Sequence, residues 1–273
     1  IAAMKLPRIF VINPGSTSTK IALFRGARRV FESTVQHDPA ALRAHPDVMG
    51  QADYREAVVR RELRKRKLAA ADIDVWAARG GLLRPVPGGV YTVNRRMLKD
   101  LAGCRYGEHA CNLGAIIASR LAAGTRAPVY IANPVVVDEL DPVARITGHP
   151  GVERRSIFHA LNQKAVAEKA AARLGRPYRR CRLIVAHVGG GISVGVHRGG
   201  RVVDVNNALE GDGPFSPERT GSLPALAFHR LVTARKLAPR EVAALVTRGG
   251  GLYAHLGTND CRELVRRIAR GRA

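Results

Sequence analysis

The stretch RIFVINPGSTSTKIALF, residues 8–24, decides how the start of the chain folds. Two apolar runs, residues 9–12 and 21–24, flank an Asn-Pro-Gly turn, a pattern that predicts two strands joined by a tight turn. Hydroxyl side chains and Lys20 follow the glycine, and hydroxyls, an ammonium and freed backbone N–H groups suit a phosphate. The turn is no Walker A loop, because Lys20 follows Thr19 rather than a glycine. On this stretch alone, an ordinary hairpin with a polar turn fits equally well.

The second half of the chain repeats this pattern. An apolar run at residues 183–188 enters three glycines at 189–191, and alternating runs follow at residues 192–197 and 201–205. Two related hairpins predict two similar domains that face each other across a cleft. We expect each domain to offer one turn to the same phosphate chain.

Length and composition narrow the class of protein. With 273 residues, 46% of them hydrophobic, the chain has room for two modest domains. No apolar run is long enough to span a membrane and no secretory signal opens the sequence, so we expect no membrane partner. The four cysteines lack CxxC spacing, which predicts neither a zinc site nor a disulfide framework and favours a cytoplasmic location.

The charge is strongly basic, with 45 Lys and Arg against 22 Asp and Glu and a net charge of +23. Basic surfaces bind nucleic acids by releasing counterions, so this class must be considered. However, the charge is spread along the chain and no cluster of aromatic side chains accompanies it. The densest run, residues 60–67, has apolar neighbours at Val59, Leu63 and Leu68, which predicts one face of an amphipathic helix. We therefore expect no specific nucleic-acid partner, only incidental affinity for polyanions.

Strand-like and helix-like patterns alternate along the chain, which predicts an α/β fold. Further strands are expected at residues 29–35, 73–78, 90–93 and 128–132. A basic helix is expected to follow the loop-rich residues 37–52 and to end at about residue 70. Further helices are expected at residues 109–123, 156–175, 223–234, 239–247 and 260–269. Ser156 is the expected cap of one helix and Asn259 or Asp260 that of the last. A Gly- and Pro-rich linker at 147–151 predicts domains at residues 5–148 and 149–273.

Several residues could carry chemistry. Residues 191–195 match G-x-S-x-G, but a nucleophile elbow needs a following helix, so Ser193 is predicted to be a strand residue. Arg79 and Arg219 could each grip a carboxylate or a phosphoryl group, although a lone arginine is more often a surface residue. Histidines such as His109, His159 and His187 are, taken singly, more often structural than catalytic. Mg²⁺ prefers oxygen ligands, and no spacing chooses among the candidates, which are Asn13, Asn133, Asp138, Asp204, Glu210 and Asp212.

Longer motifs resemble those of the acetate kinase family, in particular its butyrate kinases, within the actin/hexokinase/Hsp70-type phosphotransferase superfamily. They are VINPGSTSTK at residues 11–20, RGGLL at 79–83, GEH at 107–109, PVVVDEL at 134–140, SIFHALNQ at 156–163, AHVGGGISVG at 186–195 and DGPFSPER at 212–219. The resemblance covers nearly the whole chain.

This resemblance implies two actin-like (ribonuclease H-like) domains around a nucleotide cleft. It also implies direct in-line phosphoryl transfer from ATP, with Mg²⁺, to butyrate, giving butyryl phosphate and ADP, by an enzyme that forms a homo-oligomer, a dimer or larger. By matched position, the implied catalytic residues are Arg79, Arg219, His159 and His109. The implied nucleotide-binding residues are Asn13, Ser16, Ser18, Lys20, His187, Gly189, Gly190 and Gly191, and the implied metal ligands are Asn13 and Asn133.

Two departures from the family pattern shape the expectations. Asn133 stands where the family usually has an aspartate, which predicts weaker Mg²⁺ binding. The sequence stops soon after residues 257–260, so we expect an incomplete second domain, poor nucleotide binding and slow or no turnover. Other short or branched carboxylates stay open as the acceptor, and a non-catalytic polyanion-binding protein derived from a kinase is the alternative outside this class.

Overall fold

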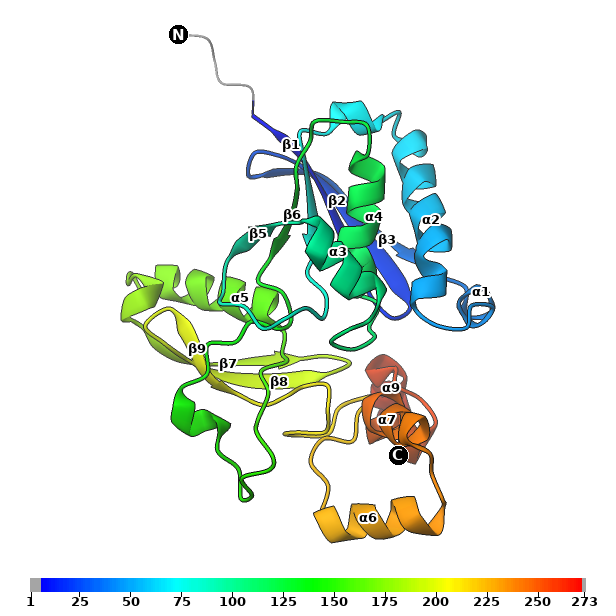
Figure 1. Ribbon diagram of the computed structural model, residues 1–273, viewed down its shortest axis with the longest axis vertical. Coiled ribbons are helices and arrows are strands. Elements are labelled where there is room, and N and C mark those ends of the chain that lie inside the picture. Colours follow the sequence, from blue (N-terminus) through cyan, green and yellow to red (C-terminus); the bar gives the residue numbers. More distant parts are fainter. Residues whose placement is uncertain (1–5, 272–273) are drawn as a thin grey trace. The chain divides into compact units, whose positions relative to one another are not determined.

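The computed structural model describes residues 6–271 and is shown in Figure 1. The chain divides into two compact units, one ending at Val136 and the other beginning at Val137. This division comes earlier than the linker expected at residues 147–151. The domain limits 5–148 and 149–273 stay a prediction, and residues 5, 272 and 273 lie outside the described part.

The first unit is built on a six-stranded sheet in the order β3-β2-β1-β4-β6-β5. β1, β2 and β3 form an antiparallel meander, β1, β4 and β6 are parallel, and β5 is antiparallel to β6. The predicted first hairpin is confirmed, with Asn13 opposite Lys20 in the register. The strands are β1 (Arg8–Pro14), β2 (Ser18–Arg25), β3 (Arg28–Gln36), β4 (Val75–Arg79), β5 (Val90–Thr92) and β6 (Val129–Ala132).

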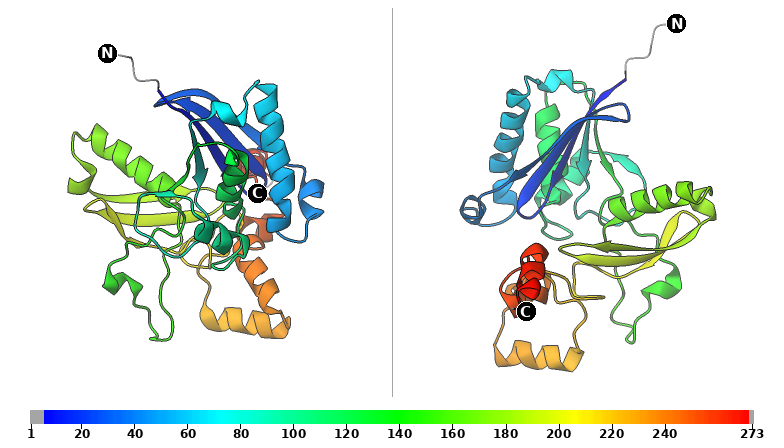
Figure 2. Two further views of the ribbon diagram at one scale, coloured as in Figure 1. Left: turned by 45° about the horizontal axis from the view of Figure 1, so that its top comes forward. Right: turned by 180° about the vertical axis from the view of Figure 1, so that it is seen from behind.

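Helices of the first unit pack on one face of this sheet, behind the strands in the right-hand view of Figure 2. They are α1 (Pro39–Arg43), α2 (Ala52–Lys65), α3 (Arg95–Ala102) and α4 (Asn112–Ala122), with 3-10 turns at Met49–Gln51 and Ala70–Asp72. α2 buries Val59 and Leu63 and exposes most of its basic side chains, so the amphipathic helix is confirmed, although it ends before residue 70. α3 was not expected from the sequence. It is a two-turn helix capped by the Asn94 side chain, which accepts from the N–H of Met97.

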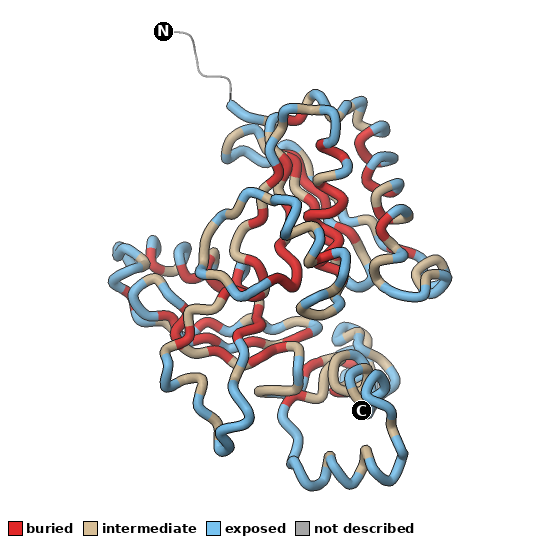
Figure 3. Tube along the Cα trace, in the orientation of Figure 1, coloured by how far each residue is buried: buried red, intermediate tan, exposed pale blue. Residues whose placement is uncertain are grey.

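The core of the first unit lies between the sheet and α4, along the buried strands in Figure 3. Leu113, Ile117 and Leu121 lie one turn apart on α4 and are almost wholly buried. On β4, Trp76 is fully buried and its ring centroid is 5.3 Å from that of Phe10 on β1. Aromatic pairs at this spacing contribute about 0.5–1.5 kcal/mol beyond their area burial. This packing fixes the ends of β1 and β4, where predicted site residues lie.

The second unit holds a three-stranded antiparallel sheet, β7 (Arg182–Val188), β8 (Ile192–Arg198) and β9 (Arg201–Val205), in sequence order. The second predicted hairpin is thus confirmed. Helix α5 (Ala160–Arg173) lies along one face of the sheet, as Figure 1 shows. α5, the sheet and the segment that precedes α5 pack together through buried apolar side chains, among them Val137, Phe158 and Val202. 3-10 turns occur at Pro142–Arg145 and Tyr178–Arg180.

The expected Ser156 cap is wrong. The Ser156 hydroxyl donates to the carbonyl of Val137, 2.6 Å away, and α5 begins only at Ala160, with His159 in the N-cap position. Serine is a frequent cap because its oxygen accepts backbone N–H bonds, but here a tertiary contact takes that hydroxyl. The consequence is that His159, rather than Ser156, stands at the start of the helix.

Four helices follow the second sheet: α6 (Ala225–Ala234), α7 (Pro239–Arg248), α8 (Gly251–Leu256) and α9 (Cys261–Ala269). The helices expected near 223–234, 239–247 and 260–269 are confirmed. Asp260 caps α9 by accepting from the N–H of Arg262 at 2.9 Å. α8 was missed, because it starts inside a run of three glycines, with Gly251 at φ +61°. Within residues 6–271, no helix has the length and apolar character needed to cross a bilayer.

Each unit also buries one histidine. His37, which is 5% exposed, bonds through Nε2 to the hydroxyl of Thr19 at 2.8 Å, and His197 is fully buried. Burial, with the nearby charge of Arg55, lowers the pKa of His37 to about 4. Burial, with the nearby charge of Lys164, lowers the pKa of His197 to about 4, against a smaller opposing effect of Glu139. Both rings are therefore neutral in the folded protein at neutral pH.

We predict that these two histidines make the folded protein less stable as the pH falls from about 6.5 to about 4. In this window the unfolded chain binds protons that the folded protein excludes, so each histidine removes up to about 1.4 kcal/mol of unfolding free energy per pH unit. Their contribution is fully present above this window. Urea denaturation at a series of pH values measures the slope.

The His197→Gln variant should lose stability less steeply in this window than the parent chain does. His255→Gln, a change at an exposed position, is the control and should keep the parent slope. Equal slopes in His197→Gln and the parent chain would show that His197 is not held neutral.

Candidate active site

The predicted residues fall in both units, and each group is described within its own unit. In the first unit, Asn13, Ser16, Ser18 and Lys20 gather at the end of the β1–β2 hairpin. The turn closes with a bond from the N–H of Gly15 to the carbonyl of Ser18, at 2.7 Å. Ser16 and Lys20 are exposed, while Asn13 and Ser18 are half-buried. The turn therefore presents an ammonium and a hydroxyl to solvent, as a phosphate-binding turn requires.

The shape of this turn depends on Arg55, a residue that the sequence analysis missed. Arg55 projects from α2 and is fully buried. Its guanidinium donates to the carbonyls of Gly15, Ser16 and Ser18 at 2.9, 3.0 and 3.3 Å. Gln51, the N-cap residue of α2, accepts from Nε of Arg55 at 3.0 Å and from its Nη2 at 2.9 Å. These bonds from Arg55 fix the three turn carbonyls against α2.

A signal for Arg55 was present in the sequence. Arg55, Val59 and Leu63 are spaced four residues apart, so the arginine occupies the apolar stripe of α2. An arginine in such a stripe needs buried acceptors. Arg55 is buried without a carboxylate as partner, and this burial lowers the pKa of its guanidinium below the usual value.

Arg79 stands at the end of β4, opposite Ala132 of β6. The glycines that follow it allow very close packing, because a Cβ on Gly81 would lie 2.6 Å from the Cα of Asn112. The side chain of Asn112 accepts from the N–H of Leu82 at 2.8 Å. Close backbone packing and this bond fix the direction in which the chain leaves Arg79.

His109 lies just before α4 and is half-buried. Its Nδ1 accepts from the N–H of Cys111 at 3.2 Å and lies 3.0 Å from the Cys111 sulfur. A ring nitrogen that accepts from a backbone N–H carries no proton, so the neutral ring is protonated on Nε2.

Asn133 directly follows β6 and has φ +38°, in the left-handed region that asparagine adopts more readily than most residues. Its Oδ1 accepts from the N–H of Gly89 at 2.9 Å, and its own N–H donates to the Gly89 carbonyl at 2.8 Å. These two bonds hold the loop at Gly89 against the end of β6. No cluster of three or more His, Cys, Asp or Glu side chains suited to a metal occurs in residues 6–271. The role of Asn133 as a metal ligand stays a prediction.

In the second unit, two predicted histidines stack on each other. The ring centroids of His159 and His187 are 3.7 Å apart, with an angle of 10° between the planes. Nδ1 of His187 lies 2.9 Å from Oδ1 of Asn162 on α5. Nδ1 of His159 lies 2.9 Å from the hydroxyl of Ser193 on β8. Both rings therefore have fixed orientations.

Arg219 lies beside this histidine pair, and Gly191 of the glycine turn packs against both Arg219 and His159. A Cβ on Gly191 would overlap the guanidinium of Arg219, with its Cζ at 2.8 Å, and would lie 3.4 Å from Cε1 of His159. The hydroxyl of Ser216 donates to the Gly190 carbonyl at 2.7 Å and accepts from the N–H of Arg219 at 3.2 Å. The Arg219 guanidinium also donates to the carbonyl of Ala208. The structure therefore brings His159, His187, the glycine turn and Arg219 together.

This arrangement can bind an anion. A guanidinium, two imidazoles and a glycine-rich turn are donors that stabilise charge on phosphoryl or carboxylate oxygens. Ser193 does not act as an exposed nucleophile, because it is fully buried and β8 continues through it as a strand. Its prediction as a strand residue is confirmed.

Comparison with known proteins identifies the family. The acetokinase family model matches residues 145–273. A protein of Maridesulfovibrio salexigens named "Probable butyrate kinase" is 48% identical over 264 residues, which cover 97% of this chain and 72% of that protein. One of the same name from Phocaeicola vulgatus is 51% identical over 264 residues, covering 97% of this chain and 74% of that protein. The chain belongs to the acetokinase family.

Solved structures agree with the fold of this acetokinase-family chain. A Porphyromonas gingivalis acetate kinase matches with a TM-score of 0.72 at 18% identity, covering 97% of this chain and 74% of that one. A propionate kinase from Francisella tularensis matches with a TM-score of 0.70, at the same identity and with the same shares. The likeness confirms the predicted α/β fold with actin-like domains.

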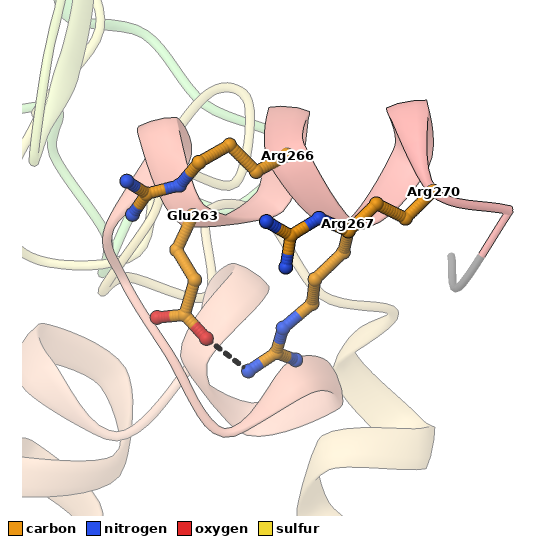
Figure 4. Close-up of a pocket in the computed structure, with 4 residues that line it drawn as sticks. All are labelled: Glu263, Arg266, Arg267 and Arg270. Carbon is orange, nitrogen blue, oxygen red and sulfur yellow. Dashed lines mark hydrogen bonds and ion pairs between the residues drawn. The ribbon is translucent and has the colours of Figure 1, made fainter.

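The second unit also has a basic hollow on α9. One side of α9 lines a space of about 610 Å³, shown in Figure 4, with Glu263, Arg266, Arg267 and Arg270. Arg267 forms an ion pair with Glu263 across the hollow. No predicted site residue lines it, so it is not part of the candidate active site.

We predict that the Arg55→Met variant lowers the unfolding free energy of the protein by at least about 3 kcal/mol, because three turn carbonyls each lose a buried donor at about 1–3 kcal/mol. Chemical denaturation measures the loss. Arg61→Met, on an exposed position of the same helix, is the matched control and should change stability by less than about 0.5 kcal/mol. Equal effects of the two variants would contradict the role given to Arg55.

Proposed function

We propose that this chain transfers the γ-phosphoryl group of ATP to butyrate and releases butyryl phosphate and ADP. The observation that carries the proposal is the grouping of Arg219, His159, His187 and the glycine turn in a member of the acetokinase family. The two relatives described above, at about half identity, are both named probable butyrate kinases. Acetate, propionate and branched short carboxylates are other acceptors within the same proposal.

The reaction needs positioning more than covalent chemistry. A butyrate oxygen attacks the γ-phosphorus, a new P–O bond forms, and the bond to the ADP oxygen breaks in line with it. The acceptor carboxylate is already ionised at neutral pH, so no base must remove a proton from it. The histidines His109, His159 and His187 therefore serve as hydrogen-bond donors. Arg79 and Arg219 hold the carboxylate and neutralise charge on the transferring phosphoryl group.

Phosphate binding is assigned to a glycine turn within each unit. In the first unit it is assigned to Asn13, Ser16, Ser18 and Lys20, and in the second unit to His187, Gly189, Gly190 and Gly191. Mg²⁺ prefers one or two carboxylates with waters and substrate oxygens. Asn13 and Asn133 provide amide oxygens only, and that of Asn133 already accepts from Gly89. This donor set fits a Mg²⁺ held mainly by the nucleotide phosphates, whose charge it neutralises when bound.

A cytoplasmic homo-oligomer, a dimer or larger, is part of the same proposal, and sedimentation in solution tests its size. The alternative, a polyanion-binding protein without catalysis, is not favoured by the relatives. Salt-sensitive binding to DNA without binding of ATP would support it instead.

The test of the proposed function is trapping of the acyl phosphate with hydroxylamine, using ATP, Mg²⁺ and butyrate. We expect product from the chain and a loss of at least about 10³-fold in Arg219→Ala, because an arginine at a transferring phosphoryl group contributes this much. Arg230→Ala, an exposed change on α6, should keep the parent rate. Absence of product from the chain with any short carboxylate would overturn the proposal.

A pair of glycine variants tests the packing of Arg219. Gly191→Ala should lower the rate of acyl phosphate formation by about 10²-fold, because a displaced guanidinium loses its productive geometry. In Gly148→Ala, outside the proposed site, no atom lies within 4 Å of the new Cβ, so the rate should change little. Equal rates in the two variants would show that contact with Gly191 does not position Arg219.

A further inference from the structure

A row of buried polar side chains runs through the second unit and ends at His159. Gln163 on α5 and Ser193 and His197 on β8 are each fully buried. Tyr178, half-buried in a 3-10 turn, stands at the far end. Buried polar groups are hydrogen-bonded in stable proteins, so each bond in the row constrains the next. The direction of every bond can be worked out from the chemistry of the groups.

Gln163 sets the direction. Its Nε2 lies 3.0 Å from the backbone carbonyl of Ser193, which can only accept, so the nitrogen of the amide is at this end. Its Oε1 therefore faces Nε2 of His197 at 3.0 Å, and that ring nitrogen must donate. The pKa of His197 is lowered to about 4, so the ring is neutral and its Nδ1 carries no proton. Nδ1 then accepts from the hydroxyl of Tyr178 at 2.7 Å.

The other end of Gln163 determines the bond to His159. Its Nε2 also lies 2.8 Å from the hydroxyl oxygen of Ser193, which accepts from it. The backbone N–H of His159 approaches the same oxygen at 3.4 Å. The one proton of this hydroxyl is therefore left to donate, and Nδ1 of His159 is 2.9 Å away. A ring nitrogen that accepts carries no proton.

We propose that Ser193 and Gln163 are positioning residues that hold the neutral ring of His159 with its proton on Nε2. Neither residue touches a reacting atom. Stacking on His187 fixes the plane of the His159 ring, and the bond from Ser193 fixes its rotation within that plane. The inference rests on the proposed function for its meaning, since an Nε2–H is a donor suited to a phosphoryl oxygen, but its test needs no turnover.

The charged groups beside the row are paired with each other. Lys164 on α5 bonds to both carboxylate oxygens of Glu139, at 2.8 and 3.1 Å, and both side chains are buried. Glu139 also accepts from the N–H of Val202 at 2.8 Å. This ion pair leaves the row itself built from neutral groups.

The test is a long-range proton–nitrogen NMR spectrum of the chain labelled with ¹⁵N-histidine, recorded at neutral pH. The signals of His159 are assigned by their loss in His159→Gln. We expect the pattern of a single tautomer, protonated on Nε2. A neutral His159 protonated on Nδ1, or an even mixture of the two tautomers, would overturn the proposal.

Variants of Ser193 and Gln163 distinguish a role in positioning His159 from a role in packing alone. Ser193→Ala should lose the single-tautomer pattern of His159, whereas Ser193→Thr, which keeps the hydroxyl, should retain it. Gln163→Leu should also give mixed tautomers of His159, because the hydroxyl of Ser193 can then donate or accept. This variant replaces Ser193→Ala in the test if Ser193→Ala does not fold. Ser156→Ala removes another buried hydroxyl, the one bonded to Val137, and should leave the spectrum of His159 unchanged.

An unchanged single tautomer in folded Ser193→Ala or Gln163→Leu would show that the row does not position the ring. The result is independent of the proposed reaction. A chain that forms no acyl phosphate but shows the expected spectra would refute the function and keep the inference. A chain that forms acyl phosphate with the wrong tautomer would do the reverse.

Discussion

The β1–β2 turn depends on one buried guanidinium. Carbonyl groups at a tight turn need partners, and water cannot reach those that face the body of a domain. Arg55 supplies donors to three of them from a helix some forty residues along the chain. The turn therefore keeps its exposed hydroxyl and ammonium in place because its inner side is fully bonded. Gln163 meets the same requirement in the second unit, where its amide bonds to both the carbonyl and the hydroxyl of Ser193.

Much of the fold could be predicted because its signals are local. Apolar runs interrupted by glycine predicted both hairpins. The motifs that contain Gly191 and Arg219 were recognised in the sequence, and the structure packs these two residues together. Arg55 and Gln163 escaped notice for the opposite reason. Each is a polar residue whose role is defined by groups distant in sequence, and a single sequence does not show which acceptors a fold will bring to it.

The errors at helix ends have a related origin. Ser156 has the chemistry of a cap, but the carbonyl of Val137 is a better placed partner for its hydroxyl, and the helix begins later. α3 and α8 are short, so neither shows enough periods of an apolar pattern to be recognised. For α5, tertiary packing rather than local propensity set the boundary.

The row from Tyr178 to His159 has a consequence for proton traffic. A chain of hydroxyls or waters can act as a proton wire, because each member can reverse its donor and acceptor roles. The amide of Gln163 cannot, since its nitrogen only donates and its oxygen only accepts. The hydrogen bonds of the row therefore fix the orientation of its side chains but cannot relay a proton along it. His159 can therefore lose a proton only from Nε2, and the interior of the domain supplies none to its ring.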